Sequence, residues 1–196
     1  MSHHHSHISS AIKIIESYTA TEPFASHLKK HFAANKKYGS KDRKTIAALC
    51  YNYFRLAHAL KNKTTEEKIL AGLFLCEYKA SPLLQALQPE LNNKITLSLE
   101  EKSAFLNIDL ATIFPFSDEL NEGLNSDSFY KSFLQQPRLF LRLRPGKEKA
   151  VVNKLTEAGI PFILQSSDCI QIVNVLKFCS KCHLIFANKK FRRVRT

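Results

Sequence analysis

The sequence has 196 residues, of which 44% are hydrophobic and 23% are charged. This composition supports a folded core and excludes a wholly disordered chain, and the length fits one medium domain or two small ones. Lysine and arginine together number 29 against 17 acidic residues, which gives a formal net charge of +12 and a pI near 9.6. This balance favours a polyanionic partner, because each phosphate that a basic side chain neutralises releases condensed counterions.

The cysteine pattern and the apolar stretches indicate the compartment. An odd number of cysteines at irregular spacings argues against the disulfide framework of a secreted protein and for reduced thiols in the cytosol. No stretch approaches the roughly eighteen apolar residues that a membrane-spanning helix needs. We therefore expect a soluble, cytoplasmic protein with no membrane partner. The five cysteines are Cys50, Cys76, Cys169, Cys179 and Cys182.

The first nine residues are rich in histidine, with four histidines in the first seven positions. They lack the apolar region of a signal peptide. Histidines at this density can chelate a metal ion, but a purification tag or a mobile chain end explains them more simply. We therefore treat 1–9 as a tag-like or mobile N-terminus, leave it out of the functional argument, and expect no metal site in the chain.

Basic and acidic residues fall in separate blocks along the chain. Residues 29–63 contain ten lysines and arginines against one acid, Asp42. Residues 66–127 contain four basic and eleven acidic residues, and residues 137–196 contain thirteen basic and three acidic residues. A solvated helix face explains single lysines well, but solubility alone favours mixed signs rather than whole blocks of one sign. The two basic blocks are therefore the expected contacts with a polyanion.

Helical spacing of apolar residues predicts two helices within 10–36 and a third over about 41–61. Gly39 is expected to end the second helix in a left-handed conformation. Ser40 is then the expected N-cap of the third helix, with Asp42 in its first turn, where negative charge is favoured. The apolar stripe of the third helix comprises Ile46, Leu49, Cys50, Tyr53, Leu56, Ala57 and Leu60.

Further helix starts follow from capping sequences. The runs TTEE at 64–67 and SLEE at 98–101 are typical of capping boxes, and the dipeptide SP at 81–82 is expected to open a short helix. Residues 126–136 show helical spacing again. We therefore expect residues 10–136 to form one mainly α-helical domain.

At Pro137 the spacing of apolar residues changes from helical to alternating. The run LFLRLR at 139–144 predicts a half-buried strand whose polar face is positive. An amphipathic helix over 147–158 and two short strands over 161–165 and 169–175 follow.

This β-α-β-β order describes most of a small ferredoxin-like or RRM-like α+β domain over 137–175. We expect the domain boundary at about residue 136. Residues 176–196 are then a basic tail to which the pattern assigns no structure.

The run CSKCH at 179–183 has the C-x-x-C-H spacing of covalent c-type haem attachment. That chemistry needs an oxidising compartment and usually a distal ligand, and the only methionine here is Met1. Two thiolates at this spacing also bind one face of a tetrahedral zinc ion, but a structural zinc site needs a second pair of ligands. Two incidental thiols are the leading interpretation.

Motifs of nucleophilic, acid–base and nucleotide-dependent catalysis are missing from the sequence. It contains no G-x-S-x-G, H-E-x-x-H, Walker-type or G-x-G-x-x-G run. A carboxylate at a helix N-terminus explains Asp42 more simply than a catalytic acid does. We therefore expect no catalytic residue and no cofactor-binding residue in this chain.

Basic and aromatic residues are interleaved in the two positive blocks, as is typical of nucleic-acid binding. One group surrounds a helix N-terminus, whose free amides and dipole also attract phosphate. Another projects from one face of the strand at 139–144. Such groups suit contacts with the phosphate backbone more than recognition of bases. The candidate RNA-binding residues are Lys36, Lys37, Tyr38, Lys41, Arg43, Lys44, Arg55, Arg142 and Arg144.

The run YGSKDRKTI at 38–46, followed by YNYFR at 51–55, resembles the N-terminal region of Sun/Fmu-type (RsmB/NOL/NSUN-like) RNA cytosine-C5 methyltransferases. In that family a NusB-like helical bundle has a G-S-x-D-R motif, with a tyrosine and an arginine one helix further on. The runs QPRLFLRL at 136–143 and LTEAGI at 155–160 resemble the small RRM-like domain that follows in the family. The resemblance covers roughly residues 8–175.

The resemblance implies a NusB-like bundle followed by an RRM-like domain, which together position structured rRNA or tRNA for a catalytic domain. That domain uses S-adenosylmethionine and has cysteines in Pro-Cys and Thr-Cys motifs. Here none of the five cysteines follows proline or threonine, and Arg144 stands where asparagine is common in the family.

We therefore expect this chain to be the RNA-binding portion of a family member, truncated before the catalytic domain and inactive alone. The alternative is a stand-alone NusB-like module that binds RNA and protein in transcription or ribosome assembly.

Overall fold

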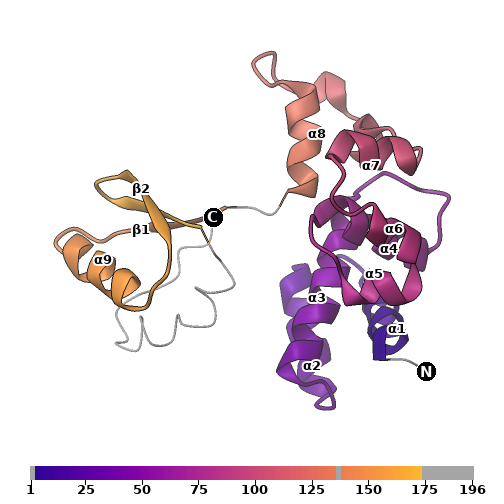
Figure 1. Cartoon of the computed structure of the whole chain (residues 1–196), viewed down its shortest axis with the longest axis horizontal. Coiled ribbons are helices and arrows are strands. Elements are labelled where there is room, and N and C mark those ends of the chain that lie inside the picture. Colours follow the sequence, from indigo (N-terminus) through magenta and orange to yellow (C-terminus); the bar gives the residue numbers. More distant parts are fainter. Residues whose placement is uncertain (1–2, 136–137, 174–196) are drawn as a thin grey trace. The chain divides into compact units, whose positions relative to one another are not determined.

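The computed structural model describes residues 3–135 and 138–173. Contacts between residues divide the chain into two compact units, Met1–Gln136 and Pro137–Thr196. This division falls where the apolar spacing of the sequence changes from helical to alternating. The described residues are mainly helical, with one small antiparallel sheet in the second unit (Figure 1). None of the described helices is long and apolar enough to cross a membrane.

The first unit is built from helices joined by short connections (Figure 1). Helices α1, α3 and α4 form its centre, where two clusters of buried apolar side chains meet. The elements are α1 His3–Glu16, α2 Phe24–Ala34, α3 Ser40–Arg55, α4 Thr65–Cys76, α5 Pro82–Leu87, α6 Pro89–Asn93, α7 Leu99–Phe105, the 3-10 turns Leu110–Ile113 and Ser117–Glu119, and α8 Ser126–Leu134.

The larger cluster is built from buried apolar side chains of α1, α2, α3, α4 and α5. Ile14, Ile46 and Phe74 are completely buried in it. The smaller cluster joins the turns after α3 and one side of α4 to α7 and α8, and Leu75 and Leu134 are among its most buried members. The sequence predicted this burial for α3, where Ile46, Leu49 and Cys50 of the expected stripe lie on one helix face.

The predicted helix starts at residues 64–67 and 98–101 are confirmed. The backbone amide of Thr64 donates to Glu67 Oε2 over 2.8 Å, and the amide of Glu67 donates to Thr64 Oγ1 over 3.2 Å. Ser98 and Glu101 make the same pair of hydrogen bonds. Each capping box satisfies two amides that the first helical turn leaves without partners.

The expectation of a tag-like or mobile segment at 1–9 is wrong for the described residues 3–9. They form the first two turns of α1, and Ile8 is only 2% exposed. Ile8 precedes Ile12 and Ile15 at helical spacing, so the apolar stripe that predicted a helix from residue 10 begins earlier. Ile8 is the first apolar residue of the buried helix face, His7 beside it is also buried, and His3 and His5 are exposed.

Two expected helix boundaries also differ. Gly39 does not adopt a left-handed conformation: its φ is −67°, and it is itself the N-cap of α3, so Ser40 is the first helical residue. Helix α3 ends at Arg55 rather than near residue 61, and Ala57 has a φ of +43°. Leu56 and Ala59 are nevertheless buried, because the turns after the helix direct both side chains into the core. In the sequence, these apolar residues therefore look like a continuation of the helical stripe.

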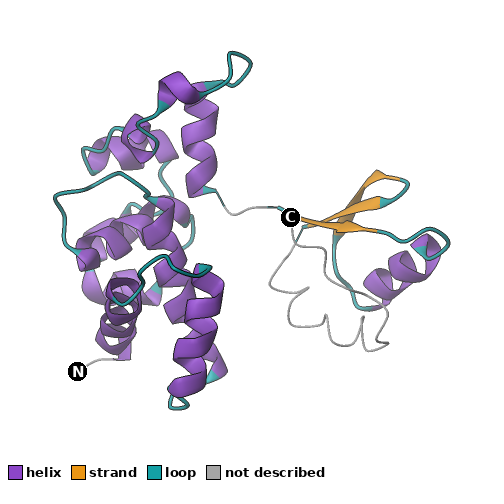
Figure 2. Cartoon of the chain, turned by 180° about the vertical axis from the view of Figure 1, so that it is seen from behind, coloured by secondary structure: helices purple, strands orange, loops and turns teal. Residues whose placement is uncertain are grey.

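The second unit contains strand β1 Leu139–Arg142, helix α9 Glu148–Glu157, strand β2 Phe162–Ser166 and strand β3 Cys169–Ile172. The predicted β-α-β-β order is confirmed. The strands pair antiparallel in the order β1-β3-β2, with β3 in the middle, and α9 covers one face of the sheet (Figure 2). The predicted tail at 176–196 and the end of the third strand at 174–175 lie outside the described residues.

Candidate nucleic-acid interface

Five of the candidate residues lie on the connection between α2 and α3 and on the first turns of α3. We call Lys36, Lys37, Lys41, Arg43 and Lys44 the junction patch, and all five are exposed. They fall within nine consecutive residues because the chain leaves one helix and enters the next there. Exposed cations at this density raise the local potential for a phosphate backbone.

Tyr38, also a candidate contact, has a structural position. Its ring is half-buried and packs edge-on against Phe32, with 5.8 Å between ring centroids, and lies near-parallel to the ring of His31 at 6.2 Å. Its hydroxyl donates to Ser10 Oγ over 3.1 Å. Lys37 Nζ stands 5.2 Å from the ring centroid. Tyr38 therefore anchors the connection to α1 and α2, which leaves little of its ring available for stacking on a base.

Asp42, the one acid within residues 29–63, is held by two hydrogen bonds. Its Oδ2 accepts from the backbone amide of Gly39 over 2.9 Å, and its Oδ1 lies 3.0 Å from His7 Nε2. The hydrogen bond with His7, followed by the one from Gly39, lowers the pKa of Asp42 below its usual value. The sequence analysis expected the free amides at the start of α3 to attract a phosphate. The Gly39 amide donates its hydrogen bond to the Asp42 carboxylate instead. Phosphate contacts at this site would come from the lysines and arginines instead.

Arg43 and Arg55 of the first unit differ in how exposed their side chains are. Arg43 is exposed, but its Nε donates to the carbonyl oxygen of Tyr38 over 2.9 Å, so part of the guanidinium holds the connection in place. Arg55 is half-buried beside Cys76. It lies twelve residues after Arg43 on the same helix, about 18 Å along the axis at 1.5 Å per residue. Arg55 is therefore not part of the junction patch.

In the second unit, β1 has one buried and one exposed face. Leu139 and Leu141 pack towards α9, whereas Phe140 and Arg142 are exposed on the opposite face, and Arg144 is exposed just after the strand. Arg142 Nε lies 3.5 Å from Asp168 Oδ2, and both side chains are largely exposed. An exposed pair at that distance contributes little to stability. Arg142 can therefore exchange this partner for a phosphate at low cost.

Phe140 is a functional candidate that the sequence reasoning missed. Its register partner on β3 is Gln171, and the register partner of Gln171 on β2 is Ile163. Phe140 and Ile163 are 50% and 49% exposed, so apolar side chains flank a central glutamine on the open face. In the alternating run at 139–144, Phe140 is two residues before Arg142 and four before Arg144, which is the spacing of residues on one face of a strand. That spacing was the available signal.

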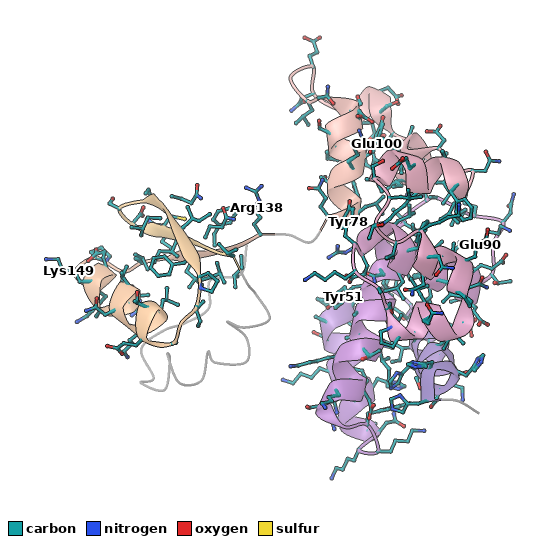
Figure 3. All side chains as sticks on the ribbon, viewed as in Figure 1. Tyr51, Tyr78, Glu90, Glu100, Arg138 and Lys149 are labelled. Atoms are coloured by element: carbon teal, nitrogen blue, oxygen red, sulfur yellow. The ribbon has the colours of Figure 1, made fainter. Side chains whose placement is uncertain are left out.

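We call Phe140, Ile163, Gln171, Arg142 and Arg144 the sheet patch. An exposed aromatic ring offers a stacking surface to a nucleic-acid base, and neighbouring arginines bind phosphate. Arg138, at the residue before β1, adds a further exposed cation (Figure 3). The patch thus places an exposed aromatic ring beside exposed arginines.

Neither Cys50 nor Cys76 offers an activated thiol. Burial raises the pKa of Cys50 to about 12 and that of Cys76 to about 11, so both are protonated near neutral pH. Cys50, Cys76 and Cys169 are free thiols. The CSKCH run at 179–183, with its haem, zinc and incidental-thiol interpretations, lies outside the described residues.

Comparisons of this chain with protein-family models, with curated proteins and with solved structures find no match.

Proposed function

We propose that this protein binds structured RNA, and that it does so as the RNA-binding portion of an S-adenosylmethionine-dependent rRNA or tRNA cytosine-5 methyltransferase. In this role the first unit is a NusB-like bundle and the second an RRM-like domain, and both position the RNA for a catalytic domain outside this sequence. The proposal has two parts, RNA binding and membership of a methyltransferase, and they are tested separately.

The observation on which RNA binding rests is the exposure of the predicted cations in both units. Lys36, Lys37, Lys41, Arg43 and Lys44 are exposed in the first unit, and Arg142 and Arg144 in the second. The one acid within the first basic block, Asp42, directs its oxygens to His7 and Gly39. Asp42 therefore does not pair with the exposed cations of the first unit, and among the described residues Arg142 of the second unit has only the exposed, 3.5 Å contact with Asp168. A phosphate backbone is the polyanion that supplies many charges in a row.

The sheet patch supports RNA over a purely electrostatic polyanion such as a polyphosphate. Phe140 is exposed on the face opposite α9, where a base can stack, and Arg142 and Arg144 lie along the same edge. Stacking of a base on an aromatic ring contributes about 1–3 kcal/mol per base and tolerates any sequence. The methyltransferase part of the proposal is supported by the order of a helical unit followed by a β-α-β-β unit, which is the order that the sequence resemblance implies.

Charge reversal of four exposed residues tests RNA binding. The variant Arg43→Glu, Lys44→Glu, Arg142→Glu and Arg144→Glu should lose binding to a structured rRNA or tRNA in a filter-binding or fluorescence-anisotropy titration. In the parent protein, log Kobs should fall linearly with log salt. A weaker substitution to alanine at the same four positions should reduce that slope by about three.

The matched control reverses four exposed lysines outside the two patches: Lys13, Lys61, Lys79 and Lys149. It changes the net charge by the same amount, so a loss confined to the first variant shows that the patches bind the RNA. Equal binding by both variants and the parent would contradict the proposed surface. Circular dichroism of each variant establishes that the loss is not unfolding.

Sequencing of the gene downstream of this chain tests the methyltransferase part of the proposal. The nucleotide sequence after codon 196, translated in all frames, should encode a glycine-rich S-adenosylmethionine loop and a Pro-Cys motif. A chain without such a sequence downstream, but with RNA binding intact, would favour a stand-alone RNA-binding module.

A further inference from the structure

His3 and His7 of α1 and Asp42 of α3 place three metal-ligating side chains together. His3 Nε2 lies 3.3 Å from Asp42 Oδ1, and His7 Nε2 lies 3.0 Å from the same oxygen. The three ligand atoms all lie within 4.8 Å of one another. The two histidines are four residues apart on one helix, a spacing that puts both rings on the same face.

These distances match the coordination sphere of zinc. Zinc binds imidazole nitrogen and carboxylate oxygen at about 2.0–2.2 Å in tetrahedral geometry, which places neighbouring ligand atoms about 3.3–3.5 Å apart. The His3–Asp42 distance equals that separation within 0.2 Å, and the His7–Asp42 distance is slightly shorter. A shift of a few tenths of an ångström in the side chains would admit the ion.

The ligand set is anchored on its inner side and open on its outer side. His7 is only 6% exposed, and its buried Nδ1 has no hydrogen-bond partner among the described residues, so Nε2 is the nitrogen that faces Asp42. The amide of Gly39 holds the other oxygen of Asp42. The side chain of His3 is 70% exposed, which leaves an entry path for the ion. Burial of His7 and the Gly39 hydrogen bond to Asp42 restrain two of the three ligands, which reduces the ordering that binding requires.

We propose that His3, His7 and Asp42 bind a divalent transition metal of the zinc type, with the fourth position taken by water. Two nitrogens and one oxygen suit zinc and its neighbours better than magnesium or calcium, which prefer oxygen ligands. The ion would link α1 to the start of α3, beside the junction patch. This inference does not depend on RNA binding.

The alternative without a metal is a carboxylate that accepts a hydrogen bond from each imidazole. A third outcome is unspecific chelation by the histidine-rich start of the chain. The chain itself offers a control for the latter, because His4 and His5 lie in the same two turns and outside the ligand set.

Zinc titration of the full chain by calorimetry tests the proposal, with Co²⁺ absorption as a second readout of tetrahedral geometry. His3→Ala should weaken zinc binding by at least about tenfold. Asp42→Asn should do the same, because an amide is a poorer ligand than a carboxylate. The double variant His4→Ala/His5→Ala should bind as the parent does. The visible band of bound Co²⁺ should be lost in His3→Ala and kept in the double variant.

Two results would overturn the proposal. The first is a parent protein that binds no zinc. The second is an equal loss of zinc affinity in His3→Ala and in His4→Ala/His5→Ala, which would indicate unspecific chelation. His7→Ala, which should also lose zinc binding, and Asp42→Asn alter contacts that support the fold, so the melting temperatures of both variants are measured without metal. His3→Ala removes a mostly exposed side chain and remains decisive if either of them unfolds.

Discussion

Gly72 of α4 lies directly against the backbone of Asn52 in α3. A Cβ atom built on Gly72 would stand 2.5 Å from the carbonyl oxygen of Asn52 and 2.8 Å from its carbonyl carbon. Real Cβ atoms do not approach backbone atoms that closely, so the two helices cross at this distance only because the residue has no side chain. Helices α3 and α4 pack against each other at the centre of the first unit, and Gly72 sets how closely they pack.

Gly72→Ala should therefore destabilise the protein. Alanine favours a helix by about 1 kcal/mol relative to glycine, but the methyl group must push apart two packed backbones, an overpacking cost of about 1–3 kcal/mol or more. We expect a net loss of about 2 kcal/mol in the free energy of unfolding, measured by urea denaturation. Gly123→Ala is the control, because a Cβ there meets no atom within 4 Å. Equal stability of the two variants would show that the helices separate freely.

The start of α1 should contribute to stability although the sequence suggested a dispensable end. Ile8→Ala removes a side chain that is 2% exposed in the larger core cluster. Such a change costs about 2–5 kcal/mol in a well-packed core. Ser9→Ala, at the exposed neighbouring position, should change the free energy of unfolding by less than about 0.5 kcal/mol. A null effect of Ile8→Ala in thermal melts would restore the mobile-end interpretation.

The capping box at α4 should make the fold sensitive to acid. The backbone amide and the hydroxyl of Thr64, followed by Lys63, lower the pKa of Glu67 from 4.5 to about 2. Because the folded pKa lies below the unfolded one, the stabilisation is complete above about pH 4.5 and is lost as the pH falls towards 2. The melting temperature of the parent should therefore exceed that of Glu67→Gln at pH 6, and the difference should shrink between pH 4.5 and 2.

Glu66→Gln is the matched control for that series, since it removes a charge from the same helical turn but leaves the contacts of Thr64 and Glu67 in place. Its difference from the parent should lack the marked change below pH 4.5. A difference between the parent and Glu67→Gln that stays constant down to pH 2 would contradict the assigned pKa.

Cys50 and Cys76 should resist alkylation in the native protein. With pKa values of about 12 and about 11 against 9.0 for an ordinary thiol, their thiolate fraction at pH 8 falls by about 100-fold or more. Peptide mass spectrometry after timed treatment with iodoacetamide measures each site. In denaturant both residues should react at the rate of a free thiol. Rapid native labelling of Cys50 would show that the contact between α1 and α3 opens readily.

The elements that the sequence predicted correctly depend on local contacts. The partners in the Thr64–Glu67 and Ser98–Glu101 capping boxes are three residues apart, so a short run of letters contains the whole interaction. The strand at 139–142 and its positive exposed face follow from alternation alone. The predicted strand ran to residue 144, whereas β1 ends at Arg142, and Arg144 is exposed just after it. The same alternation also puts Phe140 on the exposed face with Arg142.

The predictions that were wrong concern boundaries that packing decides. Helix α3 stops at Arg55, but Leu56 and Ala59 remain buried through turns, and a periodic apolar pattern does not distinguish these cases. Arg55 belongs to a basic block in the sequence, yet its position beside Cys76 of α4 sets it apart from the other cations. Tyr38 likewise is turned towards Ser10 and Phe32, residues from two different helices.

The sequence by itself determined the charge blocks, the capped helix starts and the alternating strand, because each arises from residues a few positions apart. Only the tertiary structure shows that His7 lies within hydrogen-bonding distance of Asp42, which is 35 residues away in the sequence. It also shows that the backbone of Asn52 packs directly against Gly72. Such pairs depend on how whole helices cross, and a helix crossing is set by the summed burial of many side chains. The sequence suggested that the histidine-rich start was dispensable, but Ile8 lies in the core, and His3 and His7 are candidate metal ligands.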